Sequence, residues 1–412
     1  MRIAVAAPNR QLLGGAEQYL RGLLPALRES GHEVLLVVEE DSPKGEGRVD
    51  ASLPDDAVHV VGRNVPSNAV RRIAAWHADV VYSQGLTSPA LESLLLASLP
   101  CVLYVHSYYG TCGTGEKRYR RPKLTMCERR FGPGCLALNY ALGCGTRRPR
   151  TLLAFYRRQT QRLEHLAHYR TVLVGSQHMH AVYRQHSVGD DRLQLLVLPR
   201  TGTAPVEGRV DPRALSGRVL FAGRLTPLKG CAYLVDALPV AAAALQRPLT
   251  LVVAGNGPEE KSLRECAMQK GVAAEFHGWV GAPRLQALYA DADLLAVPSL
   301  WPEPFGLVGI EAAGAGLPAV GFAVGGIPDW LVPGVTGELA RGDPPTPAGL
   351  AAAIVRALAD PAHYAALRAG ATAKATAYTM AAHVAQLTQV LTAAAFGEAP
   401  GDRTRTPSRE PR

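Results

Sequence analysis

The sequence predicts an α/β protein built from two Rossmann-like, doubly wound parallel-sheet domains that face each other across a cleft. Short apolar runs alternate with longer amphipathic runs along most of the 412 residues, which is the pattern of β-α-β units in a parallel sheet. The alternation occurs twice, and a segment rich in proline and glycine separates the two halves. The length also allows two domains, each with its own core.

The first half, residues 1–200, begins directly on a strand. Its candidate strands are mostly apolar, as expected for strands buried on both faces of a sheet. They are Ile3–Ala7, Val34–Val38, Val58–Val61, Val80–Ser83, Val102–His106 and Val172–Gly175. Between the first two, residues 16–30 place leucines at helical spacing and end at Gly31, which predicts a helix.

The second half, residues 218–380, repeats this scheme. Its candidate strands are Val219–Ala222, Leu249–Ala254, Ala274–His277, Leu294–Val297 and Ala319–Phe322. Residues 201–217 predict a linker between the domains. Residues 381–396 predict a final amphipathic helix that crosses back to the first domain, and residues 397–412 predict a disordered polar tail.

The start of the chain predicts a cytoplasmic protein. Residues 1–8 contain one basic residue and form a strand pattern without the long apolar region of a signal peptide. The longest apolar stretch, near Leu94–Val105, is interrupted by polar residues and a proline. It is shorter than the ~18 residues that a membrane-spanning helix needs.

The net charge of +9 comes from one segment. Residues 116–170 contain 14 lysines and arginines against three acids, a net +11, which leaves −2 for the rest of the chain. This confinement, with few aromatic residues interleaved among the basic ones, argues against a nucleic-acid-binding protein. Within the segment, residues 150–170 combine apolar side chains with five arginines. They fit either a helix lying on an anionic membrane at its cytoplasmic face or an ordinary helix with a solvated basic face.

A cysteine-rich basic insertion is predicted at residues 107–150. Four of the seven cysteines lie in it: Cys112, Cys127, Cys135 and Cys144. Their spacings differ from the paired Cys-x2-Cys knuckles of common zinc sites. A structural zinc site and four free thiols therefore both remain open.

The strongest candidate site follows the predicted strand Leu294–Val297. Glu303 and Glu311 stand eight positions apart around a Phe-Gly-Leu turn, and helix pitch places Glu311 about one turn into the next helix. Backbone N–H groups at such a helix start bind a diphosphate well. Here these groups belong to Phe305, Gly306, Leu307 and Val308.

Three weaker patterns also follow predicted strands, where ligands bind in doubly wound sheets. Arg224 and Lys229 lie five apart across a glycine- and proline-containing turn, so both cations can neutralise a diphosphate leaving group. Gly14 and Gly15 open the first helix and allow close approach of the backbone to a ligand. His106 ends a strand at the cleft edge. The ordinary alternatives are two solvated cations, a plain turn and a structural histidine.

These motifs resemble those of the retaining glycosyltransferases of family 4, which have the GT-B fold. The resemblance spans nearly the whole chain and is most specific from Arg218 to Gly337. It implies that Glu303 contacts hydroxyls of the donor sugar and that Glu311 holds the nucleotide ribose. Arg224 and Lys229 would bind the donor diphosphate.

Other positions carry the resemblance more loosely. It implies that the Gly14-Gly15 loop faces the donor across the cleft and that His106 lies close to the reacting sugar or the acceptor. Many relatives have His-Asp where this chain has His106-Ser107. Gly257 and Val280 belong to loops that resemble those around the nucleotide base.

The resemblance implies transfer of a hexose-type sugar from a nucleotide-diphosphate-sugar to a hydroxyl of a glycan or lipid-linked acceptor, with retention. Cell-surface polysaccharide or glycolipid biosynthesis is the expected setting. No cofactor is expected for catalysis, because two cations can do the charge work of a metal ion. The alternatives are an epimerase or phosphorylase of the same fold, a nucleic-acid-binding protein and a sugar-binding scaffold without catalysis.

Overall fold

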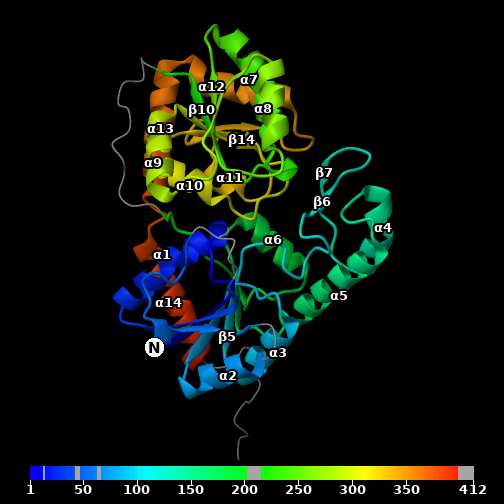
Figure 1. Cartoon of the computed structure of the whole chain (residues 1–412), viewed down its shortest axis with the longest axis vertical. Helices are drawn as coiled ribbons and strands as arrows, with labels where there is room; N and C mark the ends of the chain where they lie inside the picture. The colour runs from blue at the N-terminus through cyan, green and yellow to red at the C-terminus, as the bar shows by residue number, and fades with distance from the viewer. Residues whose placement is uncertain (13, 42–46, 63–65, 202–214, 398–412) are drawn as a thin grey trace, which may run out of the picture.

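The predicted fold class is confirmed by the structure, a computed structural model that describes residues 1–12, 14–41, 47–62, 66–201 and 215–397. Two domains, each with a parallel sheet covered by helices, are stacked along the long axis of the molecule (Figure 1). The predicted linker lies mostly, and the predicted tail almost wholly, outside the described residues.

The N-terminal sheet has seven strands in the order β3-β2-β1-β4-β5-β8-β9. All its pairings are parallel, so each strand is reached by a crossover, as in other doubly wound sheets. Its strands and helices are β1 Arg2–Asn9, α1 Gly15–Glu29, β2 Glu33–Glu40, η1 Asp55–Ala57, β3 Val58–Val60, α2 Pro66–Ala75, β4 Val80–Ser83, α3 Pro89–Ser98, β5 Cys101–Val105, β8 Thr171–Val174, α6 Gln177–Gln185 and β9 Leu193–Leu195.

The C-terminal sheet has six parallel strands in the order β12-β11-β10-β13-β14-β15. The order reverses between β10 and β13, which places a crevice at the carboxyl ends of these strands. Its elements are β10 Arg218–Ala222, η2 Pro227–Lys229, α7 Cys231–Leu245, β11 Thr250–Ala254, α8 Glu260–Gln269, β12 Ala273–Phe276, α9 Ala282–Asp291, β13 Leu294–Val297, α10 Leu307–Gly314, β14 Ala319–Phe322, α11 Ile327–Trp330, β15 Gly337–Ala340, α12 Pro347–Ala359 and α13 Pro361–Ala375.

The insertion after β5 contains more regular structure than the sequence predicted. A short antiparallel hairpin joins β6 (Arg118–Tyr119) to β7 (Thr125–Met126). Two helices follow, α4 (Gly134–Leu142) and α5 (Pro149–His165). In Figure 1 they extend beside the molecule, and the hairpin rises next to the C-terminal domain.

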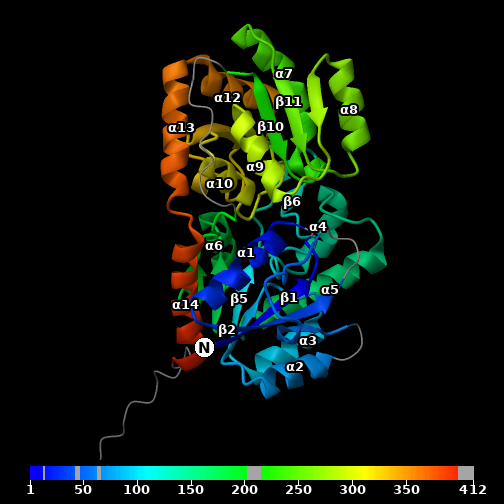
Figure 2. The ribbon, with the colours of Figure 1, turned by 60° about the vertical axis from the view of Figure 1, so that its left-hand side comes forward.

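The final helix, α14 (Met380–Phe396), packs on α1, β4 and β5 of the first domain. Figure 2 shows it in red against the N-terminal domain, below α13. His383 Nε2 lies 2.8 Å from the Tyr19 hydroxyl, and His383 Nδ1 lies 2.8 Å from the Val197 carbonyl oxygen. These contacts hold α14 on the N-terminal domain.

Among the described residues, one helical segment, Pro227–Leu245, is long and apolar enough to cross a membrane by length and composition alone. It comprises η2 and α7, and α7 packs on α8 and α12. One side of α7, including Leu234, Val235 and Leu238, is buried in the core of the C-terminal domain, while Val240 is exposed. The packing is that of a core helix.

Candidate active site

The two domains meet directly at the loop between β13 and α10. The Tyr108 hydroxyl donates to the Pro302 carbonyl oxygen at 2.6 Å, and the Ser176 hydroxyl donates to the Pro304 carbonyl oxygen at 2.5 Å. Both acceptors flank Glu303, so residues of the first domain fix the loop that carries this carboxylate.

Glu303 is 4 % exposed and has a charged partner. Its Oε1 accepts a hydrogen bond from Lys229 Nζ at 2.6 Å and another from the Ser299 hydroxyl. No described residue donates to Oε2. The structure therefore brings together two of the predicted site residues, Glu303 and Lys229.

The backbone of the Glu303 loop depends on a pair of glycines after β14. Gly326 N–H donates to the Glu303 carbonyl oxygen at 2.7 Å. Gly325 adopts a φ of +58°, and a Cβ placed there would lie 2.3 Å from the Glu303 carbonyl oxygen. Only glycine fits such a close backbone approach in this conformation.

Glu311 lies on the second turn of α10 and makes different contacts. Its carboxylate accepts hydrogen bonds from the Thr201 hydroxyl and, at 3.4 Å, from the Tyr289 hydroxyl. Burial raises the pKa of this carboxyl, and the two hydrogen bonds oppose the shift. The two predicted glutamates thus share the loop and helix that carry them but have no common partner among the described residues.

The start of α10 has the features of an anion site. Gly306 precedes the helix with a φ of +94°, which favours glycine. The N–H groups of Leu307 and Val308 donate no hydrogen bond to any described residue, as expected for a first helical turn. A Cβ on Gly15 would lie 3.2 Å from Leu307 Cδ1, so the glycine loop of the first domain reaches this helix start.

Arg224 lies on the exposed surface after β10 and forms no ion pair with a described residue. Its charge lowers the pKa of Glu17, although burial of that carboxyl is the larger influence and raises it. Glu17 follows Gly14 and Gly15 in the first turn of α1. Arg224 therefore acts on Glu17 only through its charge, while Lys229 is bound by Glu303.

His106 lies at the end of β5, in contact with other rings. Its centroid is 4.8 Å from that of Tyr104 and 5.6 Å from that of Tyr19. Its Nε2 is 2.8 Å from Gln84 Oε1. Burial lowers the pKa of His106 to about 3, with a smaller effect from His383, so the imidazole is neutral near pH 7.

Gly257 lies where the structure leaves no room for a side chain. A Cβ there would lie 2.3 Å from the Leu225 carbonyl oxygen, and Leu225 N–H donates to the Asn256 carbonyl oxygen at 2.8 Å. The turns after β10 and β11 thus pack backbone against backbone. Val280 is half-buried against the core of the C-terminal domain. A nucleotide contact for either residue stays a prediction.

The four insertion cysteines line one small cavity beside the β6–β7 hairpin. Lys117 N–H donates to Cys112 Sγ at 3.4 Å. Burial, followed by the neighbouring thiols, raises the pKa of Cys144 to about 11. No group of three or more histidine, cysteine or acidic side chains in the described part of the chain is arranged to hold a metal ion, and the zinc site stays a prediction.

The sequence did not predict three residues that contact the site. Gln84 binds His106, Thr201 binds Glu311 and Ser299 binds Glu303. Gly325, which shapes the Glu303 loop, lies in a Gly-Gly-Ile-Pro motif that the sequence does show. The other three carry no local pattern, since their roles arise only when the chain folds.

Both halves of the chain match known protein families. A model described as "Glycosyltransferase Family 4" matches residues 13–196, and one described as "Glycosyl transferases group 1" matches residues 216–360. The first match lies on the N-terminal domain and the second on the C-terminal domain.

Individual relatives are similar over a shorter region. An uncharacterized glycosyltransferase of Methanocaldococcus jannaschii is 38% identical over 34% of this chain and 36% of its own length. A D-inositol 3-phosphate glycosyltransferase of Streptomyces griseus is 36% identical over 40% of this chain and 36% of its own length. The matches therefore span little more than a third of these curated relatives.

A solved structure matches along nearly the whole chain. HepE of Anabaena in complex with UDP superimposes with a TM-score of 0.68 at 20% identity, over 95% of this chain and 100% of that one. This likeness shows the fold. The architecture is that of the GT-B fold, and the two halves of the chain match the family 4 and group 1 glycosyltransferase models, one in each domain.

Proposed function

We propose that this chain transfers a sugar from a nucleoside-diphosphate-sugar to a hydroxyl acceptor, with retention of the anomeric configuration. The observation that carries the proposal is the pairing of Glu303 with Lys229 through one carboxylate oxygen, with the other oxygen left without a described donor. A buried carboxylate held in this way can accept hydrogen bonds from sugar hydroxyls without reorganising.

The donor diphosphate would bind between the two predicted cations and the start of α10. The exposed guanidinium of Arg224, the Lys229 ammonium and the N–H groups of Leu307 and Val308 supply positive charge and hydrogen-bond donors. As the glycosidic bond to the donor breaks, negative charge grows on the leaving diphosphate, and these groups stabilise it. Glu311, with Thr201, would hold the nucleotide ribose.

The acceptor hydroxyl would come from the side of the first domain. His106 is neutral near pH 7 and so can exchange a hydrogen bond with a reacting hydroxyl without bringing a full charge. A glycan or lipid-linked acceptor at the cytoplasmic side of a membrane fits this arrangement, in the assembly of a cell-surface polysaccharide or glycolipid. UDP is the first nucleotide to test, since HepE was solved with it.

The test is a thermal-shift panel of UDP, GDP, ADP and their sugars on the wild-type protein, Arg224→Ala and Arg284→Ala. Arg284 is an exposed arginine on α9 and serves as the matched control. A nucleotide at 100 times its dissociation constant stabilises the folded state by about 2.7 kcal/mol. We expect one nucleotide family to do so, with loss of the shift only in Arg224→Ala.

Two results would contradict the proposal. One is a melting temperature that no nucleotide changes, and the other is equal binding by the two arginine variants. Transfer is separated from epimerisation by incubating the protein with nucleotide sugar alone, because an epimerase needs no acceptor. The anomeric configuration of the product, read by NMR, tests retention.

A further inference from the structure

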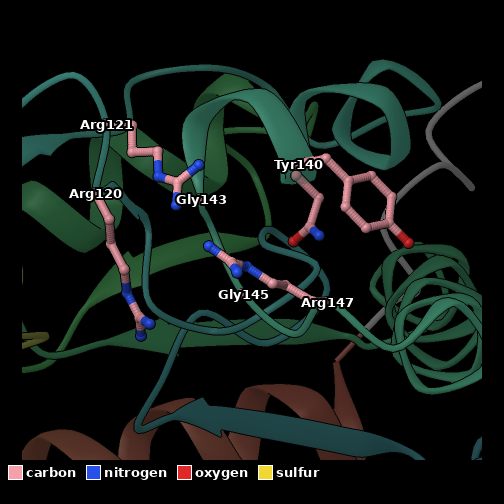
Figure 3. A pocket seen from close by; sticks show the side chains of 7 residues that line it. Arg120, Arg121, Tyr140, Gly143, Gly145 and Arg147 are labelled. Carbon is pink, nitrogen blue, oxygen red and sulfur yellow. The ribbon is translucent and has the colours of Figure 1, made fainter.

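The insertion contains a polar cavity, separate from the Glu303 site, where three arginines meet. The cavity has a volume of about 110 Å³ and lies where the β6–β7 hairpin, the end of α4 and the start of α5 come together. Arg120, Arg121 and Arg147 line it with Asn139 and Tyr140 (Figure 3), and we call it the arginine pocket. The side chains of Arg121 and Arg147 extend toward each other in this view.

The positive charge of the arginine pocket is only partly balanced. Glu116 pairs with Arg120 at 2.9 Å and is shared with Arg118 at 3.3 Å. Neither Arg121 nor Arg147 forms an ion pair or a side-chain hydrogen bond with any residue that the structure describes. Two guanidinium groups therefore share a small volume without a counter-charge from the protein.

The adjacent helices do not supply that counter-charge. Arg147 lies two residues before α5, whose first turn contains no acidic residue, although a helix N-terminus favours anions and disfavours cations. The C-terminus of α4 would attract a cation, but the Leu142 carbonyl oxygen already accepts the N–H groups of Arg120 and Arg121 at 2.9 and 3.1 Å. The helix ends alone do not explain three arginines here.

A buried amide at the pocket wall also has unused capacity. Asn139 is 2 % exposed, and its Nδ2 donates to the Thr146 carbonyl oxygen at 2.8 Å. Its Oδ1 has no hydrogen-bond partner among the described residues. A buried acceptor of this kind costs stability unless a ligand or water binds it. It can accept a hydrogen bond from a hydroxyl on a bound group.

We propose that the arginine pocket binds a phosphate or diphosphate group. Guanidinium groups match the geometry of phosphate oxygens and bind them in pairs of parallel hydrogen bonds. The volume equals that of about three to four waters at roughly 30 Å³ each, which is enough for a compact anion. Asn139 Oδ1 would accept from a protonated oxygen of that group or from a neighbouring hydroxyl.

Resting on the proposed transferase function, the assignment extends to the acceptor, which would carry this phosphate. The insertion begins directly after His106 at the end of β5, and its first residues include Tyr108, which hydrogen-bonds to the Glu303 loop. The same chemistry is offered by a lipid headgroup and by a soluble phosphate ester.

Binding of inorganic pyrophosphate, measured by calorimetry on the full-length chain, tests the pocket. Every protein carries Arg224→Ala, which removes the proposed donor-diphosphate contact. The pocket variant adds Arg121→Gln and Arg147→Gln. The control adds Arg157→Gln and Arg184→Gln, which remove the same charge from exposed arginines elsewhere. We expect the pocket variant to bind at least ten-fold more weakly than the control. Equal affinity, or no binding in either protein, would overturn the proposal.

Vesicle flotation identifies the source of the phosphate. The same proteins are mixed with vesicles containing phosphatidate, which has a phosphomonoester, or phosphatidylglycerol, which has none. Loss of phosphatidate binding only in the pocket variant indicates a lipid headgroup. Equal vesicle binding by both variants, with the pyrophosphate difference retained, indicates a soluble phosphate ester. The nucleotide panel uses protein with an intact arginine pocket, so the two proposals can fail independently.

Discussion

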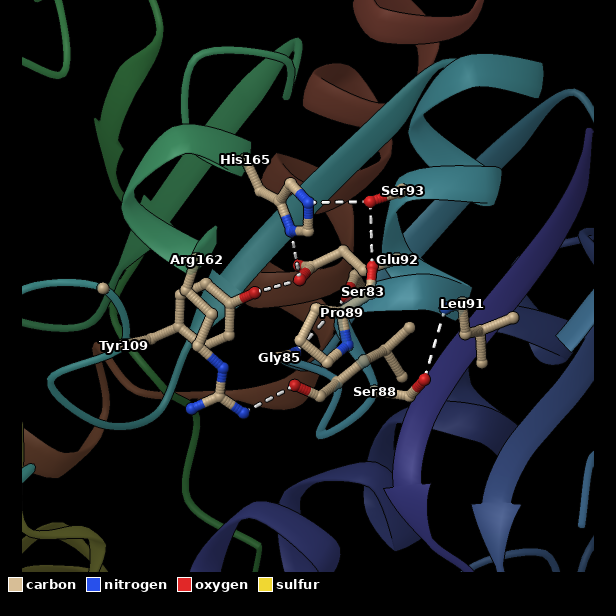
Figure 4. A network of polar contacts seen from close by, with 12 residues as sticks. Ser83, Gly85, Ser88, Pro89, Leu91, Glu92, Ser93, Tyr109, Arg162 and His165 are labelled. Carbon is tan, nitrogen blue, oxygen red and sulfur yellow. Dashed lines mark hydrogen bonds and ion pairs between the residues drawn. The ribbon is translucent and has the colours of Figure 1, made fainter. Parts of the chain in front are cut away.

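Two buried glutamates, Glu92 and Glu303, show the difference between a polar group that holds the fold and one that is available to a ligand. Glu92 on α3 is 1 % exposed and Glu303 is 4 % exposed. Both oxygens of Glu92 accept hydrogen bonds. One accepts from Tyr169, and the other accepts from Tyr109 and from His165 on α5, as Figure 4 shows. In Glu303 both protein donors bind the same oxygen.

The comparison shows that burial alone does not distinguish a functional carboxylate from a structural one. Residues of the first domain donate to both oxygens of Glu92, and these contacts hold the end of α5 against α3. Glu303 lies where the two domains meet, and no described residue donates to its Oε2. Buried polar groups are normally satisfied within the protein, so a mostly buried carboxylate that keeps one oxygen without a protein donor is the better indication of a site.

The largest expected effect follows from Glu303→Gln. The amide keeps the size and the contacts of Oε1 but removes the charge and replaces an acceptor oxygen with a donor. We expect kcat/KM for transfer to fall about 100-fold or more, with a free energy of unfolding within about 2 kcal/mol of wild type. A variant with normal activity would remove Glu303 from the proposed mechanism.

Glu92→Gln should give the opposite result. Its amide group cannot accept from both tyrosines and the histidine, so buried hydroxyls lose their partner. We expect the free energy of unfolding to drop by about 2–4 kcal/mol, while activity per folded molecule is unchanged. Urea denaturation followed by fluorescence measures this free energy of unfolding. Glu164→Gln, an exposed change on α5, is the control, and an equal loss in both variants would refute the structural role of Glu92.

The buried histidines should make the stability of the folded state depend on pH, and this effect is smaller than those of the two substitutions. Burial lowers the pKa of His106 to about 3 and those of His178, His186 and His383 to about 4. Their neutral forms favour folding, so stability is fully present above the unfolded pKa of about 6.5 and is lost as the pH falls toward 4. Each contributes a slope of up to about 1.4 kcal/mol per pH unit.

Burial raises the pKa of four carboxyls, Glu17, Glu259, Glu311 and Asp329, and these act in the opposite direction, so the net slope is smaller than the sum over histidines. Melting temperatures of wild type and His383→Gln between pH 4.5 and 8 measure this effect. We expect a fall below pH 6.5 that is shallower in the variant. Stability that is constant over this range would contradict the burial of these imidazoles as neutral groups.

The fold was largely predictable because buried parallel strands leave a strong apolar signal. The strand at Leu294–Val297 was predicted with its observed bounds. Two edge strands were missed, β9 and β15. β9 has three residues, two of them exposed, and β15 contains a glycine and a glutamate, so neither forms a run of buried apolar residues.

The candidate site was predictable only where function requires a local pattern. The Glu303 loop and the Arg224 turn have such patterns, and Glu303 does contact Lys229. The arginine pocket was visible in the sequence only as charge, because its three arginines converge through the packing of a hairpin against two helix ends. Asn139 has no sequence signal at all, since its importance comes from burial of an unpaired oxygen.

The most direct measurement is calorimetric binding of the nucleotide sugar that the thermal-shift panel identifies and of its nucleoside diphosphate, to wild type, Glu303→Gln and Arg224→Ala. If Glu303 holds the sugar, Glu303→Gln weakens the nucleotide sugar about ten-fold and leaves the diphosphate unchanged, while Arg224→Ala weakens both alike. Equal losses for the two ligands in Glu303→Gln, or no loss for either, would contradict the assignment of its open oxygen to the donor sugar.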